Sequence, residues 1–226
     1  MKLSIIIPVY NEVSTIKKVI DSVNDTNFDK EIIVVDDGST DGTREALEKF
    51  NNRFKIIYHK KNMGKGAAIR SALEHITGDV VLFQDADLEY DPSEYIFLIE
   101  PIQKGFADVV YGSRLSGGRP QRMYMFWHKL GNAFLTFLTN ILYNTTLSDM
   151  ETGYKVFKRD IIRNLNIKSK GFSVEAEITA KVLKKGCRVY EVPISYYGRS
   201  YAEGKKITWK QGVSAVITLL WYRFFN

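Results

Sequence analysis

Residues 80–89 place a short apolar strand directly before a cluster of acidic side chains. Val80–Phe83 is a continuous apolar run, which is typical of a strand buried on both faces of a parallel sheet. Asp85, Asp87 and Glu89 follow it at alternate positions. Ligands of open α/β sheets bind beyond the carboxyl ends of the strands, so these carboxylates suit Mg²⁺ or Mn²⁺ beside substrate phosphates. A solvated acidic turn, with Asp85 capping a helix, is the alternative at this point.

The first third of the chain alternates between apolar strands and helical stretches joined by short loops. Pro8 is expected to end the first strand, because proline cannot donate to a sheet ladder. The expected strands cover residues 3–7, 31–35, 54–58 and 80–83, and the expected helices cover about residues 15–23, 43–50 and 67–77. This alternation predicts a doubly wound α/β fold with a mostly parallel central sheet.

Polar residues follow each of the first two strands. Tyr10 and Glu12 come after the first strand, and Asp36 and Asp37 come directly after the second. An aromatic ring beside carboxylates suits a nucleobase and its ribose hydroxyls, whereas helix capping and simple packing are the alternatives. Lys65 opens the third helix, where it is either a phosphate contact or an ordinary exposed lysine. The glycine-rich motifs of dinucleotide-binding dehydrogenases and P-loop NTPases do not occur.

Composition limits the class of protein. The 226 residues are 45% apolar and 26% charged, which is typical of a globular domain. A single Cys187 and an apolar start too short for a signal peptide predict a cytoplasmic protein. Residues 1–112 carry a net charge of −6 and residues 113–226 a net charge of +12. The basic half suits phosphates or an anionic membrane, and no nucleic-acid-binding module is present.

Four motifs in the first half resemble those of family-2 inverting glycosyltransferases. They are Ile-Ile-Pro-Val-Tyr-Asn-Glu at 6–12, Val-Val-Asp-Asp-Gly-Ser-Thr-Asp-Gly-Thr at 34–43, Asn-Met-Gly-Lys-Gly at 62–66 and Asp-Ala-Asp at 85–87. The resemblance implies a Rossmann-like nucleotide-diphospho-sugar transferase fold over residues 1–210, with a donor half at 1–112 and an acceptor half at 113–210. It implies a nucleotide site of Pro8, Tyr10, Glu12, Asp36, Asp37, Lys65 and Asp85. It also implies catalytic roles for Asp85 and Asp87, and a metal on Asp87 and Glu89.

The second half is similar to the branch of dolichol- and polyprenyl-phosphate mannose or glucose synthases. The matching segments are Gly-Ser-Arg at 112–114, residues 148–153 and the basic loop at 198–207. Without the resemblance, that loop would be a solvated charged face. The branch implies acceptor-phosphate contacts from Arg114, Lys129, Arg199, Lys205 and Lys206.

Two apolar, aromatic segments suggest a membrane. Residues 123–143 and 211–226 are each either packed helices or amphipathic helices at a membrane interface. The second is shorter than the roughly 20 residues that span a bilayer. The resemblance implies peripheral contact with the cytoplasmic face of a membrane, or a membrane protein partner.

These features predict an enzyme that moves mannose or glucose from a GDP- or UDP-sugar to a polyprenyl phosphate. A lipid phosphate is already ionised near neutral pH, so the nucleophile needs positioning more than deprotonation. If the acceptor were a saccharide hydroxyl, Asp149 is the expected general base. A non-catalytic sugar-nucleotide-binding protein is the rival from another class, and a nucleotidyltransferase would need a glycine-rich basic loop after the first strand.

Overall fold

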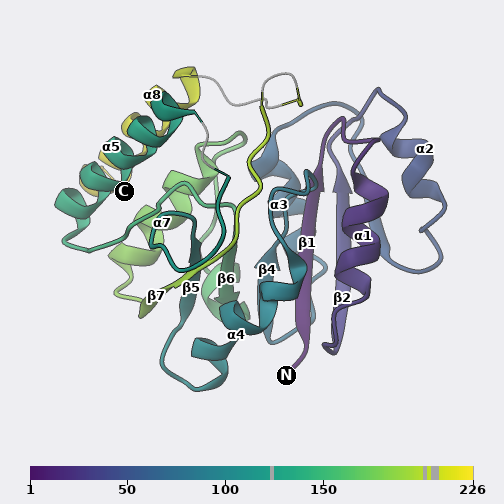
Figure 1. The fold of residues 1–226 in the computed structure, drawn as a ribbon, viewed down its shortest axis with the longest axis horizontal. Coiled ribbons are helices and arrows are strands. Elements are labelled where there is room, and N and C mark those ends of the chain that lie inside the picture. Colours follow the sequence, from purple (N-terminus) through teal and green to yellow (C-terminus); the bar gives the residue numbers. More distant parts are fainter. Residues whose placement is uncertain (123–124, 201–202, 205–208, 226) are drawn as a thin grey trace.

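The fold is built on one seven-stranded sheet, with strand order β3-β2-β1-β4-β6-β5-β7 (Figure 1). It is seen in a computed structural model that describes residues 1–122, 125–200, 203–204 and 209–225. The strands are β1 (Leu3–Val9), β2 (Lys30–Asp36), β3 (Lys55–Tyr58), β4 (Val80–Phe83), β5 (Val109–Ser113), β6 (Lys155–Lys158) and β7 (Val189–Pro193). All neighbours pair in parallel except β6, which is antiparallel to both β4 and β5. The predicted mostly parallel α/β sheet is confirmed.

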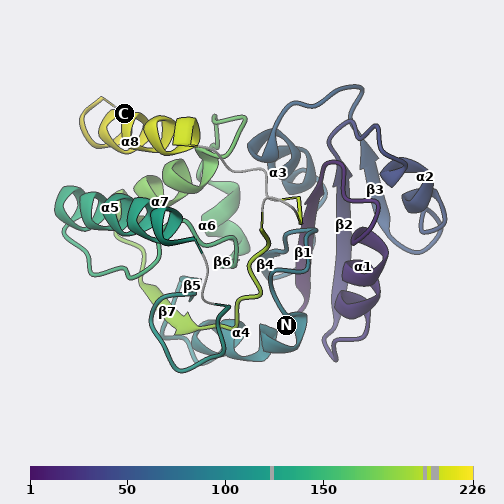
Figure 2. The same cartoon turned by 45° about the horizontal axis from the view of Figure 1, so that its top comes forward.

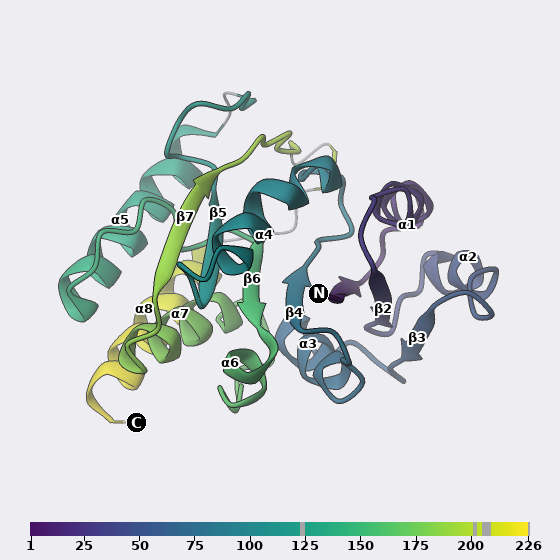
Figure 3. The same cartoon turned by 90° about the horizontal axis from the view of Figure 1, so that it is seen from below.

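Helices cover both faces of the sheet. They are α1 (Ile16–Asn24), α2 (Thr43–Glu48), α3 (Lys65–Leu73), α4 (Tyr95–Gln103), α5 (Phe126–Tyr143), α6 (Arg159–Arg163), α7 (Val174–Lys184) and α8 (Trp209–Phe224), with a 3₁₀ turn, η1 (Pro92–Glu94), before α4. Seen from below, α1 and α4 lie on one face, and α3, α6 and α7 lie on the other (Figure 3).

The two cores follow the alternation of side chains along each strand. In β1, Ile5 and Ile7 join the core under α1 and α4, whereas Ile6 joins the core under α3 and α7. All three side chains have no exposed surface. A strand buried on both faces needs a continuous apolar run rather than alternation, which is the pattern that the sequence carries in β1, β2 and β4.

A further layer lies outside α7. Helices α5 and α8 lie side by side there, and both contact α7 (Figure 2). Leu135 of α5, Ala176 and Ala180 of α7, and Leu219 of α8 form part of a small core of their own. Within the described part of the chain, no helix is long and apolar enough to cross a membrane.

The structure differs from the sequence expectations in a few local places. Pro8 does not end its strand: it lies within β1 opposite Val35, and the β4 ladder already stops at Ile6. The sequence pattern missed η1, α4 and α6. In α4 the apolar residues are dense and Pro101 lies inside the helix, so neither periodicity nor a helix-breaker rule marks it.

Candidate active site

The loops after β1 and β2 are tied together at the carboxyl edge of the sheet. The Asn11 N–H donates to Ser39 Oγ at 2.9 Å, and the Thr40 N–H donates to Asn11 Oδ1 at 2.8 Å. The Glu12 N–H donates to Thr43 Oγ1 at 2.9 Å. Tyr10, half-buried like Pro8, lies between these contacts and β1. The loop that carries the predicted nucleoside residues Tyr10 and Glu12 is therefore hydrogen-bonded to the loop after β2. We refer to these two joined loops as the wall.

Asp36 and Asp37 each hold a loop in place. Asp36 is fully buried and accepts from Arg44 Nη2 at 2.7 Å and Nε at 3.0 Å. Asp37 accepts from the N–H groups of Met63 and Gly64 at 2.9 and 2.7 Å, and lies 2.7 Å from Nδ1 of His59. Asp37 therefore accepts hydrogen bonds from the backbone N–H groups of Met63 and Gly64, which directly precede α3.

An alternating chain of buried charges runs from Asp85 into the interior. Lys65 Nζ lies 2.6 Å from Asp85 Oδ1 and 3.0 Å from Glu175 Oε1. Glu175 also pairs with Lys155, which has no exposed surface and donates to the carbonyls of Met150 and Thr152. Burial alone would lower the pKa of Lys65, but Asp85 and Glu175 hold it above its ordinary value.

The antiparallel direction of β6 brings the preceding segment to the same edge. Because β6 starts where β4 ends, the segment that leads into β6 reaches the edge that holds Asp85. A Cβ on Gly153 would lie 2.1 Å from Asp85 Oδ2, so only glycine allows this approach. The Gly153 N–H donates to the Tyr90 hydroxyl at 2.8 Å.

Asp87 and Glu89 lie on a strained turn. Leu88 between them has φ 62°, a left-handed conformation that is unusual for a large side chain and that recurs at functional sites. Burial, then the nearby Glu89 and Asp85, raise the pKa of Asp87 to about 7, against the influence of Arg199.

The chemistry of these side chains fits a divalent cation that is shared with a ligand. In the described ranges, no three His, Cys, Asp or Glu side chains converge on one point. Mg²⁺ is commonly bound by one or two carboxylates together with substrate phosphates, which Asp87 and Glu89 can provide. A cation there would also relieve the repulsion that raises the Asp87 pKa.

Arg199 contacts these donor-side carboxylates. Its guanidinium donates to both Glu12 oxygens, at 3.0 Å each, and to Asp87 Oδ2 at 3.3 Å. Its backbone N–H donates to Glu89 Oε1 at 2.6 Å. Arg199, which was expected at the acceptor phosphate, thus contacts carboxylates that were expected at the nucleotide and the metal.

Arg114 is held by Asp149. The Arg114 N–H, Nε and Nη2 donate to the Asp149 carboxylate at 2.9, 2.7 and 2.8 Å. Asn132 Nδ2 donates to the same carboxylate at 2.7 Å. Burial alone would raise the pKa of Asp149, but Arg114 and Asn132 hold it below the ordinary value. The Asp149 carboxylate is therefore engaged by Arg114 and Asn132, and its expected role as a base stays a prediction.

Tyr196 connects the two sides of the site. Its hydroxyl donates to Glu89 Oε2 at 2.7 Å, and the Arg114 guanidinium carbon lies 5.1 Å from its ring centre. Lys129 is exposed on α5. Lys205 and Lys206, also expected at the acceptor phosphate, lie outside the described residues.

Four residues of the site were not predicted from the sequence as site residues. Glu175 lies on the buried face of α7 and Lys155 lies on β6. Nothing in the sequence around either residue indicates that its charge contributes to a site. Tyr196 follows β7 and reads as an ordinary aromatic. Glu151 has a buried Oε1 atom with no hydrogen-bond partner, and burial raises its pKa to about 7.

Comparison with known proteins gives relatives in sequence and in fold. A model described as glycosyl transferase family 2 matches residues 4–165. Glycosyltransferase AglJ of Haloferax volcanii is 33% identical over 196 residues, covering 86% of this chain and 63% of that protein. Dolichol-phosphate mannosyltransferase of Pyrococcus furiosus is 29% identical over 211 residues, covering 91% of this chain and 59% of that protein. The chain therefore spans less than two thirds of either relative.

A solved structure shares the fold. Glucosyl-3-phosphoglycerate synthase of Mycobacterium tuberculosis, in complex with Mn²⁺, uridine diphosphate and phosphoglyceric acid, superposes with a TM-score of 0.75. The match covers 100% of this chain and 79% of that chain, at 21% sequence identity. At this identity the likeness extends to the architecture alone.

Gly153→Ala should disable the site without unfolding the protein. The added methyl group would displace Asp85 from Lys65, so we expect any reaction that depends on Asp85 to slow by about tenfold or more while the melting temperature changes by only a few degrees. Gly212→Ala, on α8, is a control outside the site, because a Cβ there meets nothing within 4 Å and the backbone is not left-handed. Full activity in Gly153→Ala would contradict the close approach of Asp85.

Glu151→Gln should stabilise the protein increasingly as the pH rises. Lys155, Glu175, Arg114 and Asp149 surround Glu151, and its raised pKa means that the unfolded chain ionises first. The wild-type free energy of unfolding therefore falls between about pH 4.5 and pH 7, and the glutamine variant escapes this loss.

Denaturant unfolding at pH 5 and pH 8 measures the effect. We expect the advantage of the Glu151→Gln variant to grow by about 2 kcal/mol between the two. Glu100→Gln, at an exposed acid on α4, is the control. An advantage that does not change with pH would mean that Glu151 ionises normally in the fold.

Proposed function

This chain belongs to glycosyl transferase family 2, and we propose that it transfers a hexose from a nucleotide-diphospho-sugar to a polyprenyl phosphate. The observation that carries the proposal is the adjacency of Arg114 to the carboxylate cluster. Arg114 stacks on Tyr196, whose hydroxyl holds Glu89. Arg114, the proposed contact for the acceptor phosphate, is therefore separated from Glu89 only by the Tyr196 ring. Glu89 is proposed to hold the metal at the donor diphosphate.

The donor is proposed to bind along the wall formed by the loops after β1 and β2. Tyr10 and Glu12 would contact the base and ribose, while Asp36 and Asp37 fix the loops that shape this wall. Asp85 would lie at the diphosphate with Lys65 beside it. A divalent cation held by Asp87 and Glu89 would stabilise the negative charge that develops on the leaving nucleoside diphosphate.

The acceptor needs orientation rather than activation. A phosphate monoester is largely a dianion near neutral pH, so its oxygen is already nucleophilic. Arg114, made rigid by Asp149, would hold that oxygen in line with the anomeric carbon, and Arg199 is the second guanidinium within reach of the site. A single in-line displacement would invert the anomeric centre, giving a β-linked product from an α-linked donor. The similarity to the Pyrococcus dolichol-phosphate mannosyltransferase supports this acceptor class.

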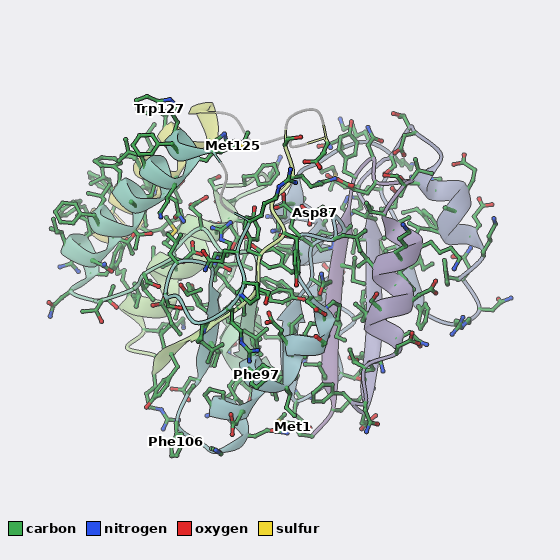
Figure 4. The ribbon with its side chains drawn as sticks, viewed as in Figure 1. Met1, Asp87, Phe97, Phe106, Met125 and Trp127 are labelled. Carbon is green, nitrogen blue, oxygen red and sulfur yellow. The ribbon has the colours of Figure 1, made fainter. Side chains whose placement is uncertain are left out.

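An exposed apolar face on α5 and α8 supports contact with a membrane. We define this apolar face by its members on the two helices, namely Trp127, Leu130, Phe134, Phe137, Ile141, Val213, Ile217, Trp221 and Phe224. Such an aromatic surface flanked by Lys129 and Arg223 suits the headgroup region of an anionic bilayer. Trp127 lies at the same end of the molecule as Asp87, and Met1 and Phe106 lie at the opposite end (Figure 4). The proposed membrane face would therefore lie on the side where the lipid phosphate is used.

A saccharide acceptor is the second candidate, and one observation favours keeping it. A hydroxyl nucleophile needs a general base with a pKa near neutrality. Asp149 does not meet this need, since its carboxylate is ion-paired and its pKa is lowered. Glu151, two residues along, has a pKa raised to about 7 and is the better base for that reaction.

A donor screen tests the proposal. Purified protein, Mn²⁺ or Mg²⁺ and a short polyprenyl phosphate are incubated with each of several GDP- and UDP-sugars, and the products are identified by mass spectrometry. Transfer of one sugar to the lipid phosphate is the expected result. Metal-dependent donor hydrolysis without a lipid product would refute the acceptor but not the family, and neither reaction would favour a non-catalytic binding protein.

Asp149→Asn should impair the use of the lipid phosphate. Removal of the carboxylate leaves the buried Arg114 without its ion-pair partner, so we expect the KM for polyprenyl phosphate to rise by about tenfold or more. The rate of donor hydrolysis should change little. A loss confined to kcat and rescued at higher pH would instead identify Asp149 as a base.

The double variant Phe134→Ser, Phe137→Ser should lose membrane binding. Both side chains are more than half exposed, so the fold should be retained. Each buried phenylalanine contributes about 2 kcal/mol to apolar transfer, so the fraction that sediments with anionic vesicles should fall by about tenfold or more. Phe106→Ser removes an equally exposed aromatic from the opposite end and serves as the control. An equal loss of vesicle binding in the double variant and in Phe106→Ser would contradict a membrane face on α5.

A further inference from the structure

Arg199 lies where positive charge is needed before any ligand binds. The guanidinium bridges Glu12 and Asp87, and its Nε lies 4.0 Å from Glu89 Oε1. Three carboxylates from two different loops thus share one cation. Without this guanidinium, the three carboxylates would lose a shared positive charge in a largely buried setting.

The segment that carries Arg199 is anchored on Glu89. The Tyr196 hydroxyl and the Arg199 N–H donate to the Glu89 carboxylate, and the Tyr197 N–H donates to the Glu89 carbonyl at 3.0 Å. These bonds do not involve the guanidinium. The side chain of Arg199 can therefore change partners while its backbone stays close to the site.

The contact of Arg199 with the acids is incomplete. Its Nε is buried, and no atom of the described residues accepts a hydrogen bond from it. An unsatisfied buried donor costs free energy, and such groups in native structures call for an explanation. If this were the only arrangement of the Arg199 guanidinium, its Nε would be expected to have an acceptor. The unsatisfied Nε therefore points to a second arrangement in which the guanidinium contacts other groups.

We infer that Arg199 is a tethered cation that neutralises the donor-side carboxylates until a divalent cation replaces it, after which it turns to the acceptor phosphate. The inference rests on the proposed function for its second step only. Asp87 and Glu89 cannot serve Arg199 and a divalent ion in full at once, so the two cations compete. The released guanidinium is then available to a phosphate, for which its planar fork is suited.

An order of binding follows from this exchange. Before the metal binds, Arg199 is occupied, so of the two arginines Arg114 and Arg199 the acceptor phosphate can use only Arg114. Once donor and metal are in place, the phosphate gains a second guanidinium. Donor with metal and lipid phosphate should therefore bind with positive coupling, which by linkage applies in both directions.

Mn²⁺ binding tests the first step without any turnover. The free Mn²⁺ signal in electron paramagnetic resonance is titrated with wild-type protein, Arg199→Ala, Arg199→Lys and the charge-matched control Lys104→Ala. Lys104 is an exposed lysine at the end of α4 that pairs with Glu100. We expect Arg199→Ala to bind Mn²⁺ about tenfold more tightly than wild type, which corresponds to the loss of one competing charge-assisted contact.

The Mn²⁺ affinity of Arg199→Lys should lie between those of wild type and Arg199→Ala. The Mn²⁺ affinity of Lys104→Ala should match that of wild type. Unchanged or weaker Mn²⁺ binding in Arg199→Ala would overturn the inference, because the arginine would then not compete with the metal. An equal gain in Lys104→Ala would also overturn it, since the effect would reflect net charge alone.

Coupling tests the second step. Binding of a short polyprenyl phosphate is measured by calorimetry with and without Mn²⁺ plus UDP, and again with Mn²⁺ plus GDP. We expect tighter lipid binding with Mn²⁺ and the accepted nucleotide in wild type, and loss of this coupling in Arg199→Ala. Lipid binding that is equally tight in both states would overturn the exchange. No lipid binding in any state would instead refute the proposed acceptor, while the Mn²⁺ comparison still decides whether Arg199 competes with the metal.

Discussion

The buried chain of alternating charges from Asp85 to Lys155 is the constraint on which the site depends. Asp85, Lys65, Glu175 and Lys155 belong to four different elements or the loops beside them, and each charge is paired with the next one along this network. Removing one partner from a buried ion pair is far more costly than never having had the pair. The network therefore fixes α3, α7 and the start of β6 relative to the carboxylates after β4, and the position of Asp85 follows from it.

The direction of β6 decides what faces this network. A parallel strand at that position would have placed its carboxyl end at the site and sent residues 149–153 to the far edge. The antiparallel strand instead brings Gly153 next to Asp85, with Asp149 and Glu151 in the segment just before it. The Asp149 carboxylate is ion-paired with Arg114, whereas Oε1 of Glu151 has no hydrogen-bond partner among the described residues. Two acids two residues apart thus have opposite electrostatic roles, and the difference arises from what each one meets in three dimensions.

The sequence predicted the elements and motifs better than the partners of each side chain. Buried strands such as Val80–Phe83 are marked by local apolar runs, and the order of the motifs identified the edge where the acids gather. Ion pairs between distant segments, such as Arg199 with Glu12, leave no local pattern, so Arg199 was expected only at an acceptor phosphate. The same limit hid Glu175 and Lys155. Helix α4 was missed for another reason, because its apolar density masks the period that identifies an amphipathic helix.

Strands β5 and β6 are neighbours in the sheet and are also consecutive in the chain, separated by the loop to α5, α5 itself and the loop that follows α5. Arg114, the exposed side of α5, Asp149 and Glu151 therefore all come from one uninterrupted stretch, residues 114–151, whereas the residues expected at the nucleotide all come before it. Substitutions confined to residues 114–151 can therefore change Arg114 and the exposed side of α5 while the loops after β1 and β2 keep their sequence.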